Sequence, residues 1–240
     1  GLDSASLHAV YLGGFSSVGY PPLFASPDIT QYSNWDSTWI PVSLPDNSSY
    51  WNTVGAGSTT LSINGLDIQT SSNLRSYTYS GTFPVFTKNF LSRFKMAVIQ
   101  QGVRTGDDIA ILYQRDNGVN SFVMSIRFDS TGFDILNNGV LAQTVSISMV
   151  DPVEFVLLVD GENVILNYRI ADSDHAKAWT TVTQTLTLLA SGLGNSYKWG
   201  HLNFTASNLQ SQWWEMHVSA GVSAGLFDNS IVPAVYPPFG

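Results

Sequence analysis

The fold of this chain is decided by the stretch DIAILYQRDNGVNSFVMSIRFDSTGFDILNNG, which spans residues 108–139. Two strand-like segments, Asp108–Arg115 and Ser121–Phe128, flank Asn117-Gly118. The Asn-Gly pair favours a tight hairpin, because the two central residues of that turn take positive φ angles that Asn and Gly tolerate. Further turns follow, the last at Asn137-Asn138-Gly139, so the stretch predicts a β-meander.

Segments with a two-residue apolar period continue on both sides of this meander. Val153–Val159 and Val164–Ile170 flank Asp160-Gly161, which predicts another hairpin. Further expected strands are Thr59–Ile63, Leu66–Thr70, Leu74–Ser80, Phe90–Gln100, Thr180–Leu189, Tyr197–Phe204 and Gln212–Ser219. Many short strands without a helical period are typical of sandwiches. The sequence therefore predicts an all-β, two-sheet antiparallel jelly-roll sandwich.

Composition divides the chain into three parts. Residues 1–48 are rich in Gly, Pro and aromatic residues, which predicts an ordered N-terminal arm or covering segment. Residues 49–220 hold the strands of the sandwich, and residues 221–240 form a Pro-rich C-terminal arm or linker. Tyr20-Pro21-Pro22 and Tyr236-Pro237-Pro238 favour extended polyproline-II arms with aromatic anchors, and ordinary linkers are the alternative.

The composition also argues against several classes of protein. Charged residues make up 12% of the chain, about half the usual share, while 44% are hydrophobic, which is ample for a buried core. The net charge of −8 argues against nucleic acid and against anionic membrane surfaces as partners. No apolar run is long enough for membrane insertion, and the lack of cysteine excludes disulfides. Because no signal-peptide pattern opens the chain, we expect a removed leader or an excised piece of a longer protein.

Several stretches of the sandwich carry a family resemblance. In chain order they are residues Asp151–Gly161, Trp179-Thr180, Asn195–His201 and Ser211–Val218. In their order and character they resemble concanavalin A-like, laminin-G-type jelly rolls, in particular those of bacteriophage tail and other virion-surface proteins. The resemblance implies a concave face that binds glycans or proteins, and a few relatives are glycosidases or polysaccharide lyases. Laminin-G-type domains often carry Ca²⁺, and the resemblance therefore implies that Asp172–Asp174 could supply oxygen ligands, but a solvated loop is the favoured interpretation of this stretch.

Catalytic groups are not evident in the sequence. A glycosidase of this fold needs two carboxylates on one strand face. Glu154 and Asp160 have the required parity, but Asp160 falls in a turn. A lyase needs a base beside a cationic side chain, and no spacing links His201, His217 and Arg127. The sequence therefore predicts no enzyme, no catalytic residue, no metal site and no required cofactor.

Aromatic residues are the remaining candidates for a binding site. On the strand Gln212–Ser219, the two-residue period places Trp213 on the polar face, opposite Trp214, Met216 and Val218. A tryptophan there could stack on a sugar or pack against an arm. We therefore expect Trp213→Ala to weaken binding without unfolding the domain. The ligand- or partner-binding candidates are Trp213, Tyr197, Trp199, Tyr20 and Tyr236.

These features favour a non-enzymatic structural module of the virion or tail type. The sandwich is its scaffold, and the two arms dock onto neighbouring subunits, so we expect a homo-oligomer in a virion or another extracellular setting. A carbohydrate-binding module of the lectin type is the alternative hypothesis. A glycoside hydrolase or polysaccharide lyase of the same fold is the third.

Overall fold

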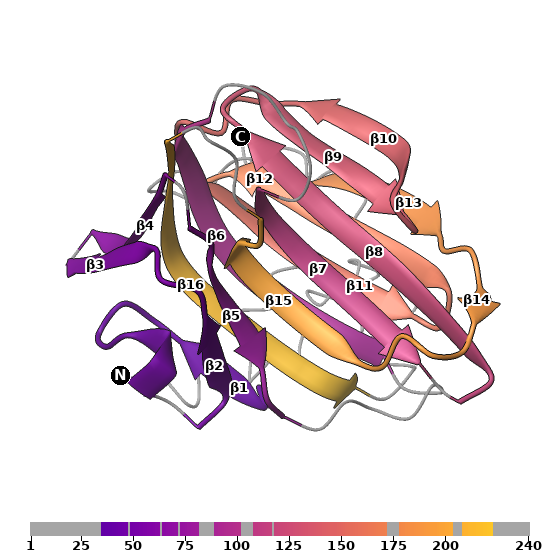
Figure 1. Cartoon of the computed structure of the whole chain (residues 1–240). Helices are drawn as coiled ribbons and strands as arrows, with labels where there is room; N and C mark the ends of the chain where they lie inside the picture. Colours follow the sequence, from indigo (N-terminus) through magenta and orange to yellow (C-terminus); the bar gives the residue numbers. More distant parts are fainter. Residues whose placement is uncertain are drawn as a thin grey trace, which may run out of the picture.

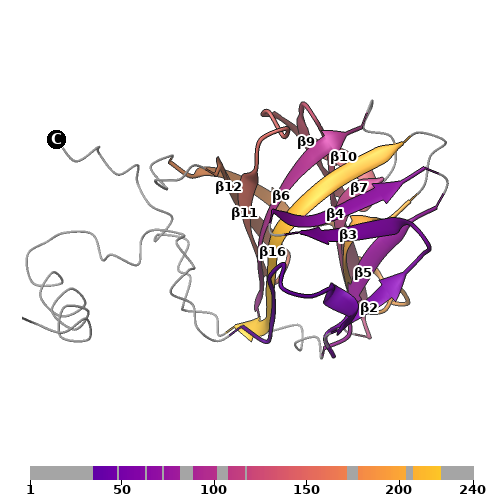
Figure 2. The ribbon, with the colours of Figure 1, turned by 90° about the vertical axis from the view of Figure 1, so that its left-hand side faces the viewer.

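The computed structural model describes residues 35–222, apart from 48, 63, 72, 82–88, 102–107, 117, 172–177 and 204–207. These residues form two antiparallel eight-stranded sheets and one short 3-10 turn, η3 (Pro45–Asn47). We call the two sheets A and B, and Figure 1 looks onto sheet B, which lies in front of sheet A. Figure 2 shows the two layers from the side, with β11 (Val153–Asp160) and β6 (Asn89–Gln100) of sheet A on the left and β7 (Ile109–Asp116) and β5 (Arg75–Tyr79) of sheet B on the right. The predicted two-sheet sandwich is thus confirmed.

The two sheets interleave strands from distant parts of the chain. Sheet A has the order β13 (Thr180–Thr185), β12 (Asn163–Ile170), β11 (Val153–Asp160), β6 (Asn89–Gln100), β16 (Leu209–Val222), β4 (Gly65–Thr70) and β3 (Ser58–Ser62), with β1 (Ser37–Trp39) beside β16. Sheet B has the order β10 (Val140–Ser146), β9 (Gly132–Asn137), β8 (Asn120–Asp129), β7 (Ile109–Asp116), β15 (Ser196–His201), β5 (Arg75–Tyr79) and β2 (Trp51–Val54), with β14 (Leu189–Ala190) beside β8.

Tight turns join the hairpins where the sequence places them. Asp160 pairs with Asn163 at the end of the β11–β12 hairpin, and Gly161 between them has a φ of 58°. At the β9–β10 turn, Asn138 and Gly139 have φ angles of 56° and 78°. Both turns therefore use the left-handed conformation that Asn and Gly adopt most readily.

The two sheets pack through aromatic side chains that point inward from alternate strand positions. Phe94 on β6 stacks on Phe155 of β11, with ring centroids 4.8 Å apart. Trp199 of sheet B lies 4.8 Å from Trp213 of sheet A, so this pair joins the layers. The largest fully buried aromatic side chains are Trp199, Trp213, Tyr77, Tyr113, Tyr197, Phe90, Phe94, Phe122, Phe128, Phe133 and Phe155. Ring pairs of this kind each add about 0.5–1.5 kcal/mol beyond the burial of their surface.

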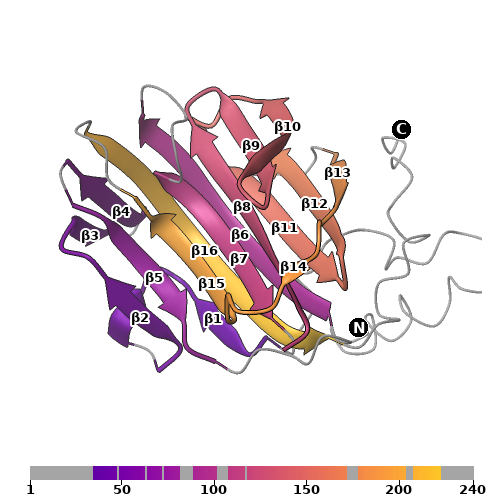
Figure 3. The same cartoon turned by 45° about the vertical axis from the view of Figure 1, so that its right-hand side comes forward.

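The sandwich is closed on one side by hydrogen bonds between its edge strands. Gln184 on β13 donates to the side-chain oxygen of Gln143 on β10 at 2.8 Å. Asn137 donates to the carbonyl of Thr185 at 3.0 Å and accepts from the backbone N–H of Thr187 at 3.0 Å. Figure 3 shows β10 and β13 on the same side of the molecule.

The structure differs from the sequence-based expectation in a few elements. Ser37–Trp39, within the expected arm, is a strand because it pairs with β16. The expected strand Thr180–Leu189 ends at Thr185, and Leu189 belongs to the separate strand β14. Asn117 of the first hairpin lies outside the described residues. Most of residues 1–48 and 221–240 also lie outside them, so the division into arms and sandwich stays a prediction.

Candidate functional site

The outer face of sheet B carries a group of side chains that point away from the core. We call this group the polar strip and define it as Thr78, Lys198, Leu112, Ser125, Gln114 and Arg127. Thr78, Lys198, Leu112 and Ser125 form one row across β5, β15, β7 and β8. Lys198 and Gln114 are half-buried, so the sheet fixes their backbone while solvent still reaches the residues, and Gln114 donates to the carbonyl of Leu193 at 2.9 Å. The hydroxyl oxygen of Thr78 is buried.

Arg127, at one side of the polar strip, is held by Asp134 of the neighbouring strand, which is itself held by Thr144 of the next strand. Its Nε donates to Oδ2 of Asp134 on β9 at 3.0 Å, and its Nη2 lies 3.0 Å from the same oxygen. Thr144 on β10 donates its hydroxyl to the other carboxylate oxygen at 2.7 Å. The side chain of Arg127 is 20% exposed, so an oriented guanidinium remains at the surface. Such a group suits hydroxyl or carboxylate oxygens of a ligand.

Asp116 fixes the loop that precedes β15 at the end of the polar strip. Its carboxylate accepts N–H groups of Gly192, Gly118 and Leu193 and the hydroxyl of Ser191. The hydrogen bonds from Gly192 and Gly118 are the main reason that the pKa of Asp116 lies well below its ordinary range. Asp116 is therefore an anchor for two loops, and its low pKa makes it a poor proton donor.

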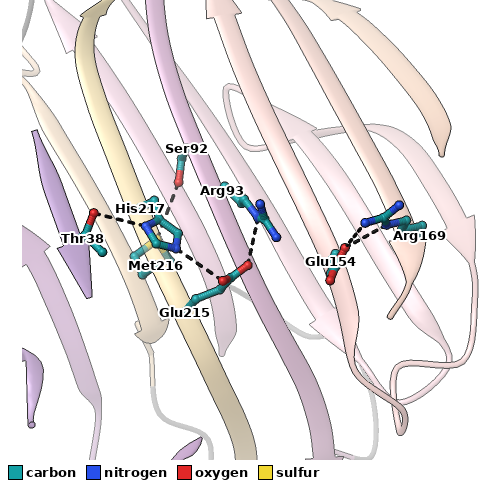
Figure 4. Close-up of polar contacts among 8 residues, drawn as sticks. All are labelled: Thr38, Ser92, Arg93, Glu154, Arg169, Glu215, Met216 and His217. Carbon is teal, nitrogen blue, oxygen red and sulfur yellow. Dashed lines mark hydrogen bonds and ion pairs between the residues drawn. The ribbon is translucent and has the colours of Figure 1, made fainter. Parts of the chain in front are cut away.

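The outer face of sheet A carries a row of charges with alternating sign, which we call the charged row: Arg169, Glu154, Lys95 and Glu215 on β12, β11, β6 and β16. Figure 4 shows two ion pairs of this row, Glu154 with Arg169 within it and Glu215 with Arg93, which stands beside it on β6. Nη2 and Nε of Arg169 both lie 2.8 Å from Oε2 of Glu154, and these side chains are only 7% and 2% exposed. Arg169 also lies 4.3 Å from the ring centre of Trp179. Because a buried charge is tolerated only with a partner, this pair is tied to the fold.

The second ion pair of the charged row continues into a short polar chain. Arg93 Nε donates to Glu215 Oε1 at 2.9 Å, and His217 Nε2 lies 3.4 Å from Glu215 Oε2 (Figure 4). His217 Nδ1 in turn lies 3.3 Å from the hydroxyl of Thr38 on β1. Burial by itself raises the pKa of Glu215, but the hydrogen bond with His217 and the charge of Arg93 outweigh it and hold this pKa below its ordinary value.

The charged row does not form a glycosidase pair. Glu154 and Glu215 share a face, but β6 lies between their strands. A glycosidase acid must keep its proton near neutral pH, which requires a raised pKa. Glu215 instead has a lowered pKa, and Glu154 is paired with Arg169 at 2.8 Å. Both carboxylates therefore serve as ion-pair partners.

His201 is buried between the sheets, where it cannot act as a base on a polymer. Its Nδ1 lies 2.7 Å from the hydroxyl of Thr70, and its Nε2 lies 2.8 Å from the hydroxyl of Ser211. Ser211 also accepts the indole N–H of Trp213 at 2.9 Å. Burial lowers the pKa of His201 from 6.5 to about 3, because the imidazolium loses its hydration there.

The neutral His201 makes stability depend on pH below about 6.5. The unfolded chain binds a proton at this residue below pH 6.5, whereas the folded chain binds it only near pH 3. The contribution of His201 to the free energy of unfolding is therefore complete above pH 6.5. It falls by about 1.4 kcal/mol for each unit by which the pH drops from 6.5 towards 3. We expect His201→Gln to reduce, by this amount, the slope of the free energy of unfolding against pH below pH 6.5. Urea unfolding at a series of pH values measures this slope.

Thr70→Val is the matched control for His201, because it removes one hydrogen bond and keeps the imidazole buried. This variant should be less stable at every pH with the original slope, since burial causes the pKa shift. An unchanged slope in His201→Gln would show that His201 titrates alike in the folded and unfolded chains.

The predicted position of Trp213 on the polar face is wrong. Trp213 pairs with Met96, and Glu215 pairs with the adjacent Lys95, so Trp214 is an extra residue in a β-bulge. The bulge reverses the two-residue alternation and turns Trp213 into the core with 0% exposure. Trp214 lies instead beside Lys95, whose Nζ is 5.8 Å from its ring centre.

The other predicted binding residues do not form a surface site either. Tyr197 and Trp199 point into the core and are 0% exposed, while Tyr20 and Tyr236 lie outside the described residues. Their part in ligand or partner binding stays a prediction. Of the polar strip, Arg127 alone is among the residues that the sequence singles out, and there as a cation of a lyase site. The signal lay in the alternation of β15, where Lys198 falls between the core residues Tyr197 and Trp199.

The structure does not assemble the other chemical sites that the sequence raises. His201 is buried between the sheets, His217 lies on the outer face of sheet A and Arg127 on the outer face of sheet B, so no lyase site brings them together. Within residues 35–222, leaving aside the gaps named above, no three His, Asp or Glu side chains cluster as metal ligands. Asp172–Asp174, interpreted from the sequence as a solvated loop with Ca²⁺ binding as the alternative, lies outside the described residues. No helix in the described part of the chain is long and apolar enough to cross a membrane.

Comparisons with known proteins give matches in structure alone. No family model and no curated protein sequence matches the chain. Lectin I-B4 from Griffonia simplicifolia, in its metal-free form, has a TM-score of 0.51 at 12% identity, over 77% of this chain and 99% of that one. Winged bean acidic lectin, complexed with methyl-α-D-galactose, has a TM-score of 0.50 at 11% identity, over 76% and 98%. The exoplasmic/lumenal domain of VIP36, bound to Ca²⁺ and Man3GlcNAc, has a TM-score of 0.50 at 13% identity, over 78% and 89%.

These matches define the class of the fold. At such low identities, structural likeness establishes the fold and not the activity. The chain is a concanavalin A-like jelly-roll sandwich of the kind found in lectins. The concanavalin A-like part of the predicted resemblance is thus confirmed. Its phage-tail and virion part gains no support from the matches.

Proposed function

We propose that this protein is a non-enzymatic carbohydrate-binding module that holds a glycan on the outer face of sheet B. The observation that carries the proposal is the polar strip, in which Lys198, Gln114 and Arg127 are half-buried on the outer face of the sheet. Glycans are rich in hydroxyl groups, and side chains that are already positioned lose little entropy when they bind them. The fold is shared with lectins, one of which is complexed with methyl-α-D-galactose.

The chemistry of the polar strip suits binding and not hydrolysis. Its row contains the cation Lys198, and Arg127 stands beside it, whereas the nearby carboxylate Asp134 is engaged by Arg127 and Thr144. A single engaged carboxylate cannot supply both an acid and a nucleophile or base. The local excess of donors favours neutral or anionic saccharides, although the whole chain has a net charge of −8.

A glycan array probed with the full chain tests this function. We expect selective binding, and Lys198→Ala should lower the affinity for the preferred glycan about tenfold or more. A hydrogen bond from a charged group contributes about 1.5–3 kcal/mol when it is desolvated, and 1.4 kcal/mol corresponds to a factor of ten. The measurement is titration calorimetry of the chain and its variant.

Lys95→Ala is the matched control for Lys198→Ala, since Lys95 is also a half-buried lysine but stands on the outer face of sheet A. It should bind the glycan like the parent chain. Absence of selective binding across the array would contradict the proposed function. Equal losses in the two variants would contradict the assignment to sheet B.

A structural subunit, as in a virion or another extracellular assembly, is the second candidate function. It is favoured by the edge strand β10, where Val140 and Leu141 are 69% and 52% exposed. Apolar side chains on an unpaired sheet edge promote association between chains. On this hypothesis the chain forms a homo-oligomer that Leu141→Lys dissociates, as measured by light scattering after size exclusion. A monomer at all concentrations would remove the support that β10 gives to this candidate.

A further inference from the structure

A row of outward side chains continues the polar strip across sheet B to its edge strand β10. Leu112 pairs with Ser125, which pairs with Leu136 on β9. Leu136 in turn pairs with Leu141 on β10. Paired residues of a sheet point to the same face, so these leucines stand on the face that carries Lys198. The row therefore has a cation towards one end and leucines at the other.

The leucine side of this row is open to solvent. We call it the apolar end and define it as Leu112, Val123, Leu136 and Leu141. Leu141 is 52% exposed, Leu112 and Val123 are half-buried, and Leu136 is 7% exposed. None of the four belongs to the core between the sheets. The apolar end is therefore a surface of aliphatic side chains that a ligand can reach.

The donors of the polar strip lie directly beside the apolar end. Arg127 pairs with Asp134, so it is a diagonal neighbour of Leu136 across β8 and β9, at a distance of about 7–8 Å along the sheet. Lys198 is on β15, which lies four strand spacings of about 4.8 Å, or about 19 Å, from β10. A ligand that extends along the row therefore meets charged donors first and aliphatic side chains after them.

We propose that the outer face of sheet B binds an amphiphilic saccharide, one that carries an alkyl or acyl chain. Its sugar part contacts Lys198 and Arg127, and its aliphatic chain lies on the apolar end. The inference rests on the proposed glycan-binding function and adds the class of glycan to it. Hydroxyl groups gain nothing from leucine side chains, whereas an aliphatic chain leaves water when it covers them, which favours binding.

A second copy of the chain suits this row less well. Two copies that cover each other's whole row about a two-fold axis place Lys198 either against leucine or against a second lysine. Both arrangements remove a cation from water without a counter-ion. A single ligand with oxygen atoms at one end and an aliphatic chain at the other matches both parts of the row.

The methyl and octyl glycosides of the saccharide that the array selects test this inference on the full chain. Their affinities are measured by titration calorimetry, below the concentration at which the octyl glycoside forms micelles. We expect the octyl glycoside to bind about tenfold or more tightly than the methyl glycoside, because its chain is removed from water on the apolar end. Leu141→Ser should reduce this ratio to about threefold or less and change the affinity for the methyl glycoside by less than about twofold.

Val54→Ser is the matched control, because Val54 is 45% exposed on the outer face of the same sheet but stands on β2, at the opposite edge. It should keep the full preference for the octyl glycoside. Equal affinities of the two glycosides for the natural chain would overturn the inference and leave the proposed function standing, since the saccharide would still bind. Equal losses of the preference in Leu141→Ser and Val54→Ser would also overturn it. No binding of either glycoside would overturn the proposed function and this inference with it.

Light scattering of the same samples tests the other occupant of this surface. The second candidate function places a second copy of the chain on β10. If Leu141→Ser turned an oligomer into a monomer and kept the preference for the octyl glycoside, the apolar end would be a contact between copies. That result would overturn the inference.

Discussion

Replacing Trp213 with alanine is expected to lower the free energy of unfolding by about 3–5 kcal/mol, the usual cost of removing a buried tryptophan from a core. Its ring lies 4.8 Å from Trp199 and 6.2 Å from Phe94, with 0% exposure. Few side chains near the cavity are free to fill it, because both sheets hold them in register. Urea unfolding followed by far-ultraviolet circular dichroism measures the loss.

Trp214→Ala is the control that tests the bulge in β16. Trp214 is half-buried on the outer face and contacts Lys95. Removing a surface cation–π contact costs about 1 kcal/mol or less. The structure thus predicts a large loss for Trp213 and a small one for its neighbour. The reverse order would mean that β16 keeps the simple alternation of the sequence and that Trp213 stands outside.

Replacing Glu154 with leucine is expected to lower the free energy of unfolding by about 3–5 kcal/mol. The change leaves the guanidinium of Arg169, which is only 7% exposed, without the carboxylate that it contacts at 2.8 Å. A buried cation without its counter-ion keeps the full cost of losing its hydration. Urea unfolding at neutral pH measures this effect.

The double variant Glu154→Leu with Arg169→Met tests whether the loss in the single variant comes from the unpaired charge of Arg169. Apolar side chains of similar size leave no unpaired charge, so this variant should lose far less stability than the single one. A double variant that loses the sum of both single losses would show that the two residues act independently. The short distance between them would then carry no energetic coupling.

Much of the fold follows from local sequence signals. The Asp160-Gly161 turn fixes the register of β11 and β12, because a two-residue loop allows few alternatives. The inward position of Tyr77 and Tyr79 follows from their spacing of two. Such features depend on neighbouring residues alone, and a single sequence reveals them.

The misplaced Trp213 shows where local reasoning stops. A β-bulge needs one extra residue, and nothing in Gln212–Ser219 identifies it, because Trp213 and Trp214 are equally suited to either face. The bulge is defined by the partner strand, where Met96 and Lys95 are adjacent. Strand β1 is likewise defined by its partner strand, because Thr38 belongs to a strand only through its pairing with His217.

The surface sites depend on the same long-range pairing. In the sequence, Glu154, Arg169 and Glu215 are scattered charges on three strands. The register of β12, β11, β6 and β16 brings them into one row. Lys198 and Arg127 of the polar strip likewise come from β15 and β8, which lie on either side of β7. A face of a sheet can be read only after the order of its strands is known.

The most direct test of the glycan-binding account is a nuclear magnetic resonance titration of the isotope-labelled chain with the saccharide that the array selects. The account predicts shifts concentrated at the outward residues of sheet B, with Lys198, Gln114 and Arg127 among the largest. The outer face of sheet A, including Glu154 and Val156, should remain unchanged. Shifts centred on sheet A, or a spectrum that does not respond to any selected saccharide, would contradict it.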